Sequence, residues 1–278
     1  MSEIQTPTGR SIFFDDVGNG SVILVLPGMT GDRRGIYDSL TNALSRQHRV
    51  VVMDPRDSGE SNPESDYYTM ADLAGDVADL LEGLSISKAH VLGHSLGGMV
   101  ALHLCLAYPN RVDRLVLMSA VAHGGNGHRA GEPLPPPDDF WNDDPVERVR
   151  RLLPVAVGPS YRDRLTERRL DGIARLERNN RCTWDGVMRQ QATQSGLDLR
   201  DRLHEVQSTT LVICGDADDG LDRAHDLASR LRDARLLILP GVGHLPWLEQ
   251  PDVVMPAILE FLAEPCEPAP TLSGAGCQ

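Results

Sequence analysis

Short apolar runs recur along the chain and alternate with longer segments in which apolar residues follow a helical spacing. The runs lie at 11–14, 22–26, 50–53, 89–92, 115–118, 211–213 and 236–239. Each is too short for a typical helix, and glycine-rich turns bound several of them, so they predict buried strands. A mainly apolar strand, rather than an alternating one, indicates burial on both faces of a sheet.

Helical spacing is clearest after Thr69, where apolar residues stand at positions 70, 73, 77, 80, 81 and 84. Thr69 is expected to cap this helix, because a threonine hydroxyl accepts a hydrogen bond from a free N–H of the first turn. A second helix is predicted over 99–108. Strands that alternate with helices in this way predict an α/β fold with a mostly parallel, twisted sheet flanked by helices.

The alternation stops after the strand at 115–118 and resumes at 211. The intervening stretch contains a glycine-rich segment, the proline-rich run 133–137, and many arginines. We therefore predict a core of residues 1–123 and 201–264, with a helical cap of residues 124–200 inserted into it. Residues 265–278 are rich in Pro, Gly and Ser and lack periodicity, so they predict a disordered tail.

Charge separates the predicted cap from the core. The chain as a whole carries a formal charge of −13, whereas the cap holds 13 arginines against 12 acidic residues. Two interpretations remain open. The arginines form ion pairs on exposed helices, or they admit an anionic ligand that the rest of the protein would repel.

Composition excludes several classes of function. The negative charge and the aromatic content of 4% argue against a nucleic-acid partner. No apolar run approaches the roughly 18 residues that span a membrane, and no secretory signal precedes the first strand. The five cysteines are scattered without a C-x-x-C pair. We expect a cytoplasmic protein with no metal and no cofactor, because nucleotide motifs and metal-ligand spacings are also absent from the sequence.

The segment Gly93-His94-Ser95-Leu96-Gly97 has the form G-x-S-x-G between a predicted strand and a predicted helix. Glycines on both sides let the backbone turn sharply and present the Ser95 hydroxyl at the tip of the sheet. His94 is expected to point away from that tip. The start of the helix also directs its N–H groups and positive dipole end toward the site of a developing oxyanion.

A serine nucleophile needs a base, and the base needs an acid that fixes its tautomer. His244 follows two glycines after the strand at 236–239 and is the expected base. The acid is expected in the loop after the strand at 211–213, where Asp216, Asp218 and Asp219 crowd together.

The order of serine, aspartate and histidine, together with these motifs, resembles the α/β-hydrolase superfamily from about residue 9 to 262. The landmarks that carry the resemblance are Pro27-Gly28-Met29, residues 54–61, Gly93–Gly97, Gly215-Asp216-Ala217-Asp218 and Gly243-His244-Leu245-Pro246. The stretch 68–108 is most similar to small esterases, enol-lactonases and cofactor-free haloperoxidases. The family commonly has His-Gly at 27–28 and Arg-Gly at 56–57, so the departures at both places bear on substrate class. The resemblance places the acid at Asp218, three positions after Gly215.

Two backbone N–H groups would form the oxyanion hole, that of Leu96 directly after the nucleophile and that of Met29 after the strand at 22–26. Gly28 lets that backbone approach the substrate. His123, after the strand at 115–118, is a candidate for lining the pocket. Trp141 and Trp184 of the cap are candidates too, with core packing as the alternative for each.

The sequence therefore predicts a serine hydrolase that cleaves a carboxylic ester or lactone of a small to medium molecule through an acyl-enzyme. The same triad also serves perhydrolysis or haloperoxidation, C–C bond hydrolysis and acyl transfer, so these stay open. A protein that keeps the pocket for binding or a biosynthetic step without turnover is the alternative of a different class.

Overall fold

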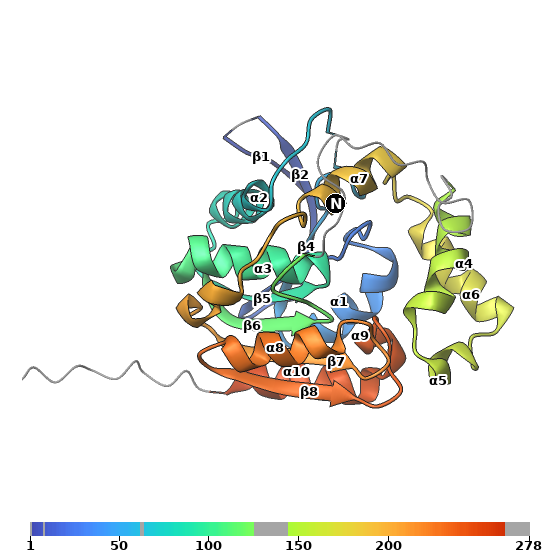
Figure 1. Ribbon diagram of the computed structural model, residues 1–278. Helices are drawn as coiled ribbons and strands as arrows, with labels where there is room; N and C mark the ends of the chain where they lie inside the picture. Colours follow the sequence, from blue (N-terminus) through green and yellow to red (C-terminus); the bar gives the residue numbers. More distant parts are fainter. Residues whose placement is uncertain (1, 8, 62–63, 125–143, 265–278) are drawn as a thin grey trace, which may run out of the picture.

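The computed structural model describes residues 2–7, 9–61, 64–124 and 144–264. Within these residues, eight strands form one sheet in the order β1-β2-β4-β3-β5-β6-β7-β8 (Figure 1). The strands are β1 (Ser2–Gln5), β2 (Ser11–Val17), β3 (Val22–Leu26), β4 (Arg49–Met53), β5 (Ala89–His94), β6 (Val112–Met118), β7 (Thr209–Gly215) and β8 (Ala234–Leu239). Neighbours from β4 to β8 are parallel, whereas β2 is antiparallel to both β1 and β4. The predicted α/β fold with a mostly parallel sheet is confirmed.

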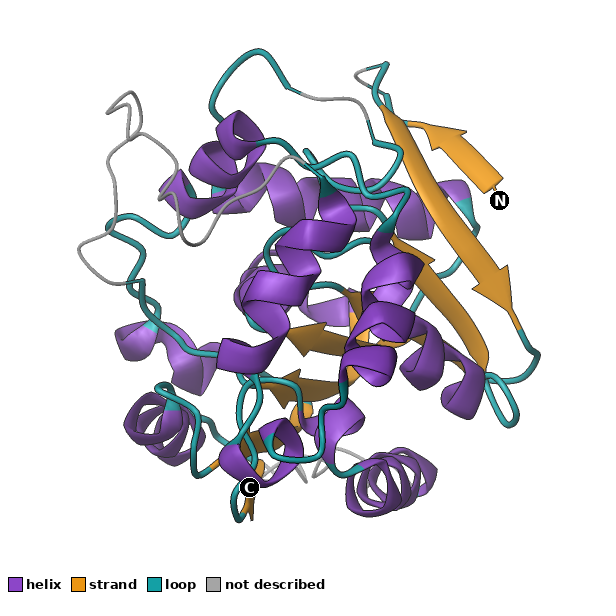
Figure 2. Ribbon diagram, turned by 90° about the vertical axis from the view of Figure 1, so that its right-hand side faces the viewer, coloured by secondary structure: helices purple, strands orange, loops and turns teal. Residues whose placement is uncertain are grey.

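Helices connect the parallel strands, as the alternating pattern predicted. They are α1 (Asp38–Leu44), α2 (Met70–Gly83), α3 (Leu96–Ala107), α4 (Pro145–Ala156), α5 (Pro159–Arg162), α6 (Glu167–Ala174), α7 (Trp184–Ala192), α8 (Leu221–Arg230), α9 (Pro246–Glu249) and α10 (Pro251–Ala263). Short 3₁₀ turns are η1 (Gly35–Tyr37), η2 (Pro109–Arg111), η3 (Arg175–Glu177) and η4 (Arg200–Glu205). The β1–β2 hairpin forms one edge of the sheet, with the N-terminus beside it (Figure 2).

The sheet divides the apolar interior into two layers, because successive residues of a strand point to opposite faces. In β3, Leu24 and Leu26 face a layer completed by α2, α3 and α8. Ile23 and Val25 of the same strand face the other layer, which α1 and α10 cover. Both faces are therefore buried, which explains why the strands are almost continuously apolar.

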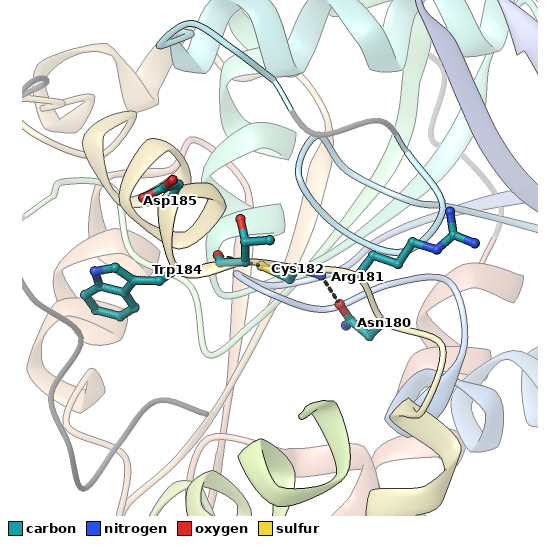
Figure 3. Close-up of a pocket in the computed structure, with 6 residues that line it drawn as sticks. Asn180, Arg181, Cys182, Trp184 and Asp185 are labelled. Atoms are coloured by element: carbon teal, nitrogen blue, oxygen red, sulfur yellow. Dashed lines mark hydrogen bonds between the residues drawn. The ribbon is translucent and has the colours of Figure 1, made fainter. Parts of the chain in front are cut away.

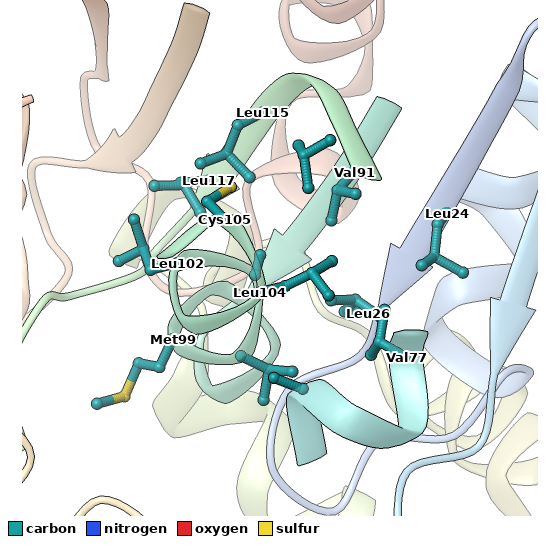
Figure 4. Packing of buried hydrophobic residues seen from close by; sticks show 14 of the residues in the cluster. Leu24, Leu26, Val77, Val91, Met99, Leu102, Leu104, Cys105, Leu115 and Leu117 are labelled. Atoms are coloured by element: carbon teal, nitrogen blue, oxygen red, sulfur yellow. The ribbon is translucent and has the colours of Figure 1, made fainter. Parts of the chain in front are cut away.

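Helix α3 packs tightly on the first of these layers (Figure 4). Leu102 and Cys105 of α3 meet Val91 of β5 and Leu115 and Leu117 of β6 in one cluster, each at most 1% exposed. Full burial of a side chain the size of leucine contributes roughly 1.5–3 kcal/mol. The contacts fix α3 against the sheet, and with it the turn that precedes the helix.

Helix boundaries agree with the sequence at α2 and differ at α3. The Thr69 hydroxyl accepts a hydrogen bond from the N–H of Asp72 at 3.2 Å, and the Asp72 carboxylate accepts one from the Thr69 N–H at 2.7 Å. The predicted cap is therefore confirmed. Helix α3 begins at Leu96, three residues before the predicted start at 99. The difference arises because the glycine-rich turn leads directly into the helix without a linker.

The stretch between β6 and β7 is mainly helical in its described part (Figure 1). We call residues 145–192, from the start of α4 to the end of α7, the insertion segment, or the insertion for short. Leu153 and Tyr161 of the insertion join the layer that α1 and α10 cover. Its arginines behave in two ways. Arg150 pairs with acidic residues of α4 and α6 on the surface, whereas Arg189 of α7 pairs with Asp57 in the loop after β4. The interpretation of ion pairs on exposed helices therefore fits Arg150, whereas Arg189 binds a buried carboxylate of a distant loop.

Across the described ranges, no helix combines the length and apolar character needed to cross a bilayer. The predicted tail at 265–278 and the candidate Trp141 lie outside the described residues.

Candidate active site

Ser95 stands in the turn between β5 and α3, with φ of 51° and ψ of −117°. Positive φ is uncommon for residues other than glycine and marks local strain. A Cβ on Gly93 would lie 2.5 Å from the carbonyl oxygen of Gly97, and a Cβ on Gly97 would lie 2.1 Å from that of Leu26. Both glycines are therefore required for the turn that presents Ser95.

Asp218 and His244 come together from the loops after β7 and β8. His244 Nδ1 lies 2.8 Å from Asp218 Oδ2. Because the carboxylate only accepts, Nδ1–H is the donor and Nε2 is left with a free lone pair. The His244 side chain is 35% exposed and that of Asp218 only 6%. The pair thus offers a reachable imidazole held from behind by a buried carboxylate.

The pKa of Asp218 is set by opposing effects. Burial favours the neutral acid, but hydrogen bonding and charge from His244, with an N–H from Gly220, lower the pKa of Asp218 to about 2. The Gly220 N–H lies 2.8 Å from Oδ1. Asp218 therefore remains ionised at neutral pH and stabilises a positive charge on the imidazole.

The two rival aspartates of the same loop lie elsewhere. Asp216 is exposed and accepts the N–H of Gly241 at 2.6 Å, so it ties two loops together. Asp219 is also exposed. Of the three candidates left open by the sequence, Asp218 is the one that the structure pairs with His244.

The His244 loop is held by residues that sequence reasoning missed. Glu249 is buried and accepts the N–H groups of Gly243 at 3.0 Å and of Gly158 at 2.8 Å. The N–H of His244 itself donates to the carbonyl of Ala156 at 2.7 Å. Gly158 and Ala156 belong to the insertion segment, so this segment helps to fix the imidazole.

A second missed group is the buried pair of Tyr37 and His94. His94 Nε2 lies 2.9 Å from the His244 carbonyl oxygen, which only accepts, so Nε2 carries the proton. His94 Nδ1 must then accept from the Tyr37 hydroxyl at 2.7 Å, and that hydroxyl accepts the Gly28 N–H at 2.7 Å. Burial, with the neighbouring His244, lowers the pKa of His94 to about 3, so the ring is neutral. His94 thus points away from the Ser95 tip, as expected, and links the loop after β3 to the loop after β8.

The turn from Gly28 to Gly31 lies beside Ser95. A Cβ on Gly28 would be 3.2 Å from the Ser95 Cβ, so glycine is what permits this approach. The turn closes through a 3.0 Å bond from the Gly31 N–H to the Gly28 carbonyl. Met29 stands inside the turn, and Leu96 is the first residue of α3, where the N–H has no acceptor within the helix. The two expected oxyanion donors therefore belong to two segments that both adjoin the nucleophile.

His123 and Trp184, the remaining described candidates, have contacts of their own. His123 forms an isolated bridge with Asp198, where the chain returns from the insertion. Trp184 packs on Cys182 and Val187. It also lines a cavity of about 340 Å³, which residues 180–185 form at the start of α7 (Figure 3). That lining comes from one stretch of the insertion, not from the strand ends that carry Ser95 and His244.

Among the residues that the structure describes, no three His, Cys, Asp or Glu side chains gather in an arrangement that could hold a metal ion.

Comparison with known proteins gives consistent matches along the chain. A family model described as the alpha/beta hydrolase fold matches residues 21–251. The 2-hydroxy-6-oxo-6-phenylhexa-2,4-dienoate hydrolase of Burkholderia cepacia is 27% identical over 269 residues, which cover 91% of each chain. RutD of Variovorax paradoxus, whose name assigns it provisionally to carbamate hydrolysis, is 30% identical over 263 residues, covering 90% of this chain and 94% of its own. A hydrolase structure from Pseudomonas aeruginosa PA01 superimposes with a TM-score of 0.76 at 27% identity, covering 95% and 98% of the two chains.

Proposed function

Because the chain belongs to the α/β-hydrolase fold family, we propose that it is a serine hydrolase that cleaves a carboxylic ester or lactone. In this proposal Ser95 is the nucleophile, His244 the general base and Asp218 the acid that orients it. The observation that carries it is the 2.8 Å bond between His244 Nδ1 and Asp218 Oδ2, at the same end of the sheet as the strained Ser95 turn. The pairing leaves Nε2 of a half-exposed imidazole able to take a proton.

The first half of the reaction forms an acyl-enzyme. Ser95 Oγ attacks the carbonyl carbon while His244 Nε2 removes the hydroxyl proton, and the carbonyl electron pair moves onto oxygen. The N–H groups of Leu96 and Met29 stabilise that oxyanion. When the tetrahedral intermediate collapses, the C–O bond to the leaving alcohol breaks and His244 returns the proton to it. In a lactone the alcohol stays attached to the acyl chain.

The second half uses water in place of Ser95. His244 removes a proton from water, the hydroxide attacks the acyl carbon, and collapse of the new intermediate expels Ser95 Oγ, which regains a proton from the imidazolium. Asp218 stays ionised throughout, because its pKa lies near 2. Each oxyanion donor typically contributes about 3 kcal/mol to transition-state stabilisation.

A second candidate reaction is hydrolysis of a C–C bond. The Burkholderia cepacia relative, which aligns along 91% of both chains, is named for a substrate with no ester or amide bond, a 6-oxo dienoate. The same three residues can serve either reaction, since both break a bond next to a carbonyl. Perhydrolysis, acyl transfer and a binding role without turnover have no supporting observation of this kind.

The proposal extends to the parts of the chain around the site. We assign the core to residues 1–123 and 201–264 and the cap to residues 124–200, with the substrate entering between them. Gly28, His123, Trp141 and Trp184 remain proposed contacts for a small-molecule substrate. A cytoplasmic location is supported by Cys105, Cys182 and Cys214, which are free thiols in the structure.

Turnover assays with two substrate classes test this proposal. Purified protein is given a series of p-nitrophenyl esters and lactones, and in parallel a 6-oxo dienoate. Ester or lactone turnover that Ser95→Ala abolishes supports the first candidate. Turnover of the dienoate alone transfers the assignment to C–C hydrolysis, and no turnover of either by wild-type protein contradicts both.

A further inference from the structure

Thr30, in the turn beside Ser95, has an unfavourable backbone conformation. Its φ is 64°, in the left-handed region. A β-branched residue is a genuine outlier there, and such conformations persist only when surrounding contacts hold them. Met29, whose N–H is a proposed oxyanion donor, is the residue directly before Thr30. Whatever holds Thr30 therefore also fixes the plane of the neighbouring peptide groups.

Two side chains of the insertion segment hold Thr30. The Thr30 N–H donates to Gln190 Oε1 at 2.9 Å. The Thr30 carbonyl accepts from Asn180 Nδ2 at 2.6 Å. Both backbone polar groups of this one residue are thus bound by residues at least 150 positions away in the sequence. The insertion therefore helps to fix the conformation of the turn at Thr30.

Gln190 is itself held firmly enough to fix the backbone of Thr30. It is 1% exposed, and its Nε2 donates to the Arg56 carbonyl at 2.7 Å and to the Ser58 hydroxyl at 2.9 Å. With Oε1 on Thr30, the amide has one acceptor and two donor bonds, so both its position and its orientation are determined. A single side chain of α7 therefore joins the loops that follow β3 and β4.

The neighbouring contacts keep α7 and the approach to it in place. Arg189 makes two bonds to the carboxylate of Asp57, at 2.9 Å and 2.7 Å. Asn180 Oδ1 accepts the Cys182 N–H at 3.0 Å, the dashed line of Figure 3, which orients the amide that reaches Thr30. Both side chains that bind Thr30 are thus themselves held by further bonds.

From these contacts we propose that Gln190, supported by Asn180, is a positioning residue for the oxyanion hole. It holds Thr30 in the left-handed conformation and so keeps the Met29 N–H directed at the substrate oxygen. The inference rests on the proposed function and adds to it: the insertion controls the rate of the chemical step as well as the choice of substrate. Without Gln190, Thr30 would relax toward negative φ and turn the Met29–Thr30 peptide group, and this would shift Met29 together with its own N–H, which belongs to the Gly28–Met29 peptide group.

A pair of matched variants on α7 tests this role. Gln190→Met keeps the length of the side chain and removes all three hydrogen bonds. Gln191→Met makes the same change at the next residue of the helix. For Gln190→Met we expect kcat to fall about 10- to 100-fold, because small misplacements at a catalytic group have effects of that order. KM should change less than about threefold, and Gln191→Met should leave both constants near wild type.

Hydrogen exchange measures the turn independently of activity. A peptide spanning residues 28–34 should exchange faster in Gln190→Met than in wild type or Gln191→Met. If exchange is unchanged, Gln190 does not hold the turn and the proposal is wrong. If exchange rises while kcat stays at the wild-type value, Gln190 holds the turn but catalysis does not depend on it, and the proposal is equally wrong. Wild-type protein that turns over no substrate would overturn the proposed function, whereas either of these results leaves it standing.

Rescue separates positioning from general loss of stability. Asn adopts positive φ more readily than Thr, so Thr30→Asn lowers the strain that Gln190 otherwise holds. Introduced into Gln190→Met, it should restore kcat at least about threefold. Failure of Thr30→Asn to restore kcat in a folded double variant contradicts the strain argument. Asn180→Ala removes the other hydrogen bond to Thr30 and should lower kcat in the same manner. It replaces Gln190→Met as the test variant if Gln190→Met does not fold.

Discussion

The Tyr37 hydroxyl and Nδ1 of His94 lie 2.7 Å apart in the interior, and through them the loop after β3 is joined to the loop after β8. The chain of bonds runs from the Gly28 N–H through both side chains to the carbonyl of His244. Every donor in it meets an acceptor, because that carbonyl fixes the tautomer of His94. Trp247 stacks on Tyr37 at 5.1 Å and meets the His94 ring edge-on at 4.7 Å, which restricts both rings.

Tyr37→Phe should therefore weaken both the fold and the site. The variant leaves the Gly28 N–H and His94 Nδ1 buried without their partner, which typically costs about 1–3 kcal/mol. We expect a lower free energy of unfolding in urea, and a lower kcat because the turn beside Ser95 is no longer tied to His94. Tyr67→Phe is the matched control, since Tyr67 is 44% exposed. Equal stability and kcat for the two variants would show that the buried hydroxyl has no such role.

Asp218→Asn should reduce ester turnover far more than Asp216→Asn or Asp219→Asn. An amide favours the wrong imidazole tautomer, and in a serine triad this change lowers kcat by about 10⁴-fold. The other two aspartates make no bond to His244 in the structure, so their variants should stay within about tenfold of wild type. Steady-state kinetics of the three variants measures the difference. A loss shared equally among them, or largest at Asp216, contradicts the assignment.

Asp32 gives a prediction for stability against pH. Burial, together with Glu177 and Asp54, raises the pKa of Asp32 to about 7 from its ordinary 3.8. Between these values the folded state binds more protons than the unfolded state, so Asp32 makes the free energy of unfolding fall as pH rises. Asp32→Asn keeps the acceptor for the Arg34 N–H and removes the titration of this carboxyl, whereas the neighbouring Glu177, whose pKa burial also raises, still titrates.

Urea unfolding at several values between about pH 4 and pH 8 tests this. Asp32→Asn should gain stability relative to wild type as pH rises, by more than about 1 kcal/mol at the upper end, since one pKa unit corresponds to 1.36 kcal/mol. Asp219→Asn is the control at an exposed carboxylate. A difference between Asp32→Asn and wild type that stays constant with pH contradicts the raised pKa.

The sequence located the catalytic candidates better than the groups that support them. Ser95 and His244 can be recognised from the local sequence, because each follows a predicted strand. Glycines stand on both sides of Ser95 and before His244. Tyr37, Gln190 and Glu249 carry no such signal, because what they do depends on contacts across the fold. Gln190, for example, reaches a partner 160 residues away.

The same distinction applies to the fold. Short, nearly continuous apolar runs identified the strands β2 to β8, because both faces of the sheet are buried, whereas the edge strand β1 (Ser2–Gln5) has no such run and was not predicted. The spacing of 3.6 residues identified α2, because one face of that helix packs on the sheet. The sequence indicated the insertion only as an interruption in the alternation of strands and helices. In that stretch Arg150 of α4 pairs with Glu167 and Asp171 of α6, while Leu153 and Leu170 of the same two helices join the apolar layer that α1 and α10 cover.

Trp184→Ala should change the preference for substrate size. Trp184 lines the cavity at the start of α7 and also packs on Cys182. As a proposed substrate contact, the indole would limit the length of the bound acyl chain, so its removal should move the ranking of p-nitrophenyl esters toward longer chains. Labelling of Ser95 by a fluorophosphonate should persist in the folded variant. An unchanged chain-length profile would make Trp184 a packing residue alone.

The most direct test of the central claim, that His244 and Asp218 activate Ser95, is the site of fluorophosphonate labelling. An activated serine oxygen attacks phosphorus, fluoride leaves, and the adduct stays on the protein. Mass spectrometry of the digested wild-type protein should locate one adduct on the peptide that contains Ser95. Ser95→Ala should show no adduct, and His244→Ala should react at least about 10³-fold more slowly. Wild-type protein that remains unlabelled at Ser95, or that labels equally fast without His244, would contradict the account.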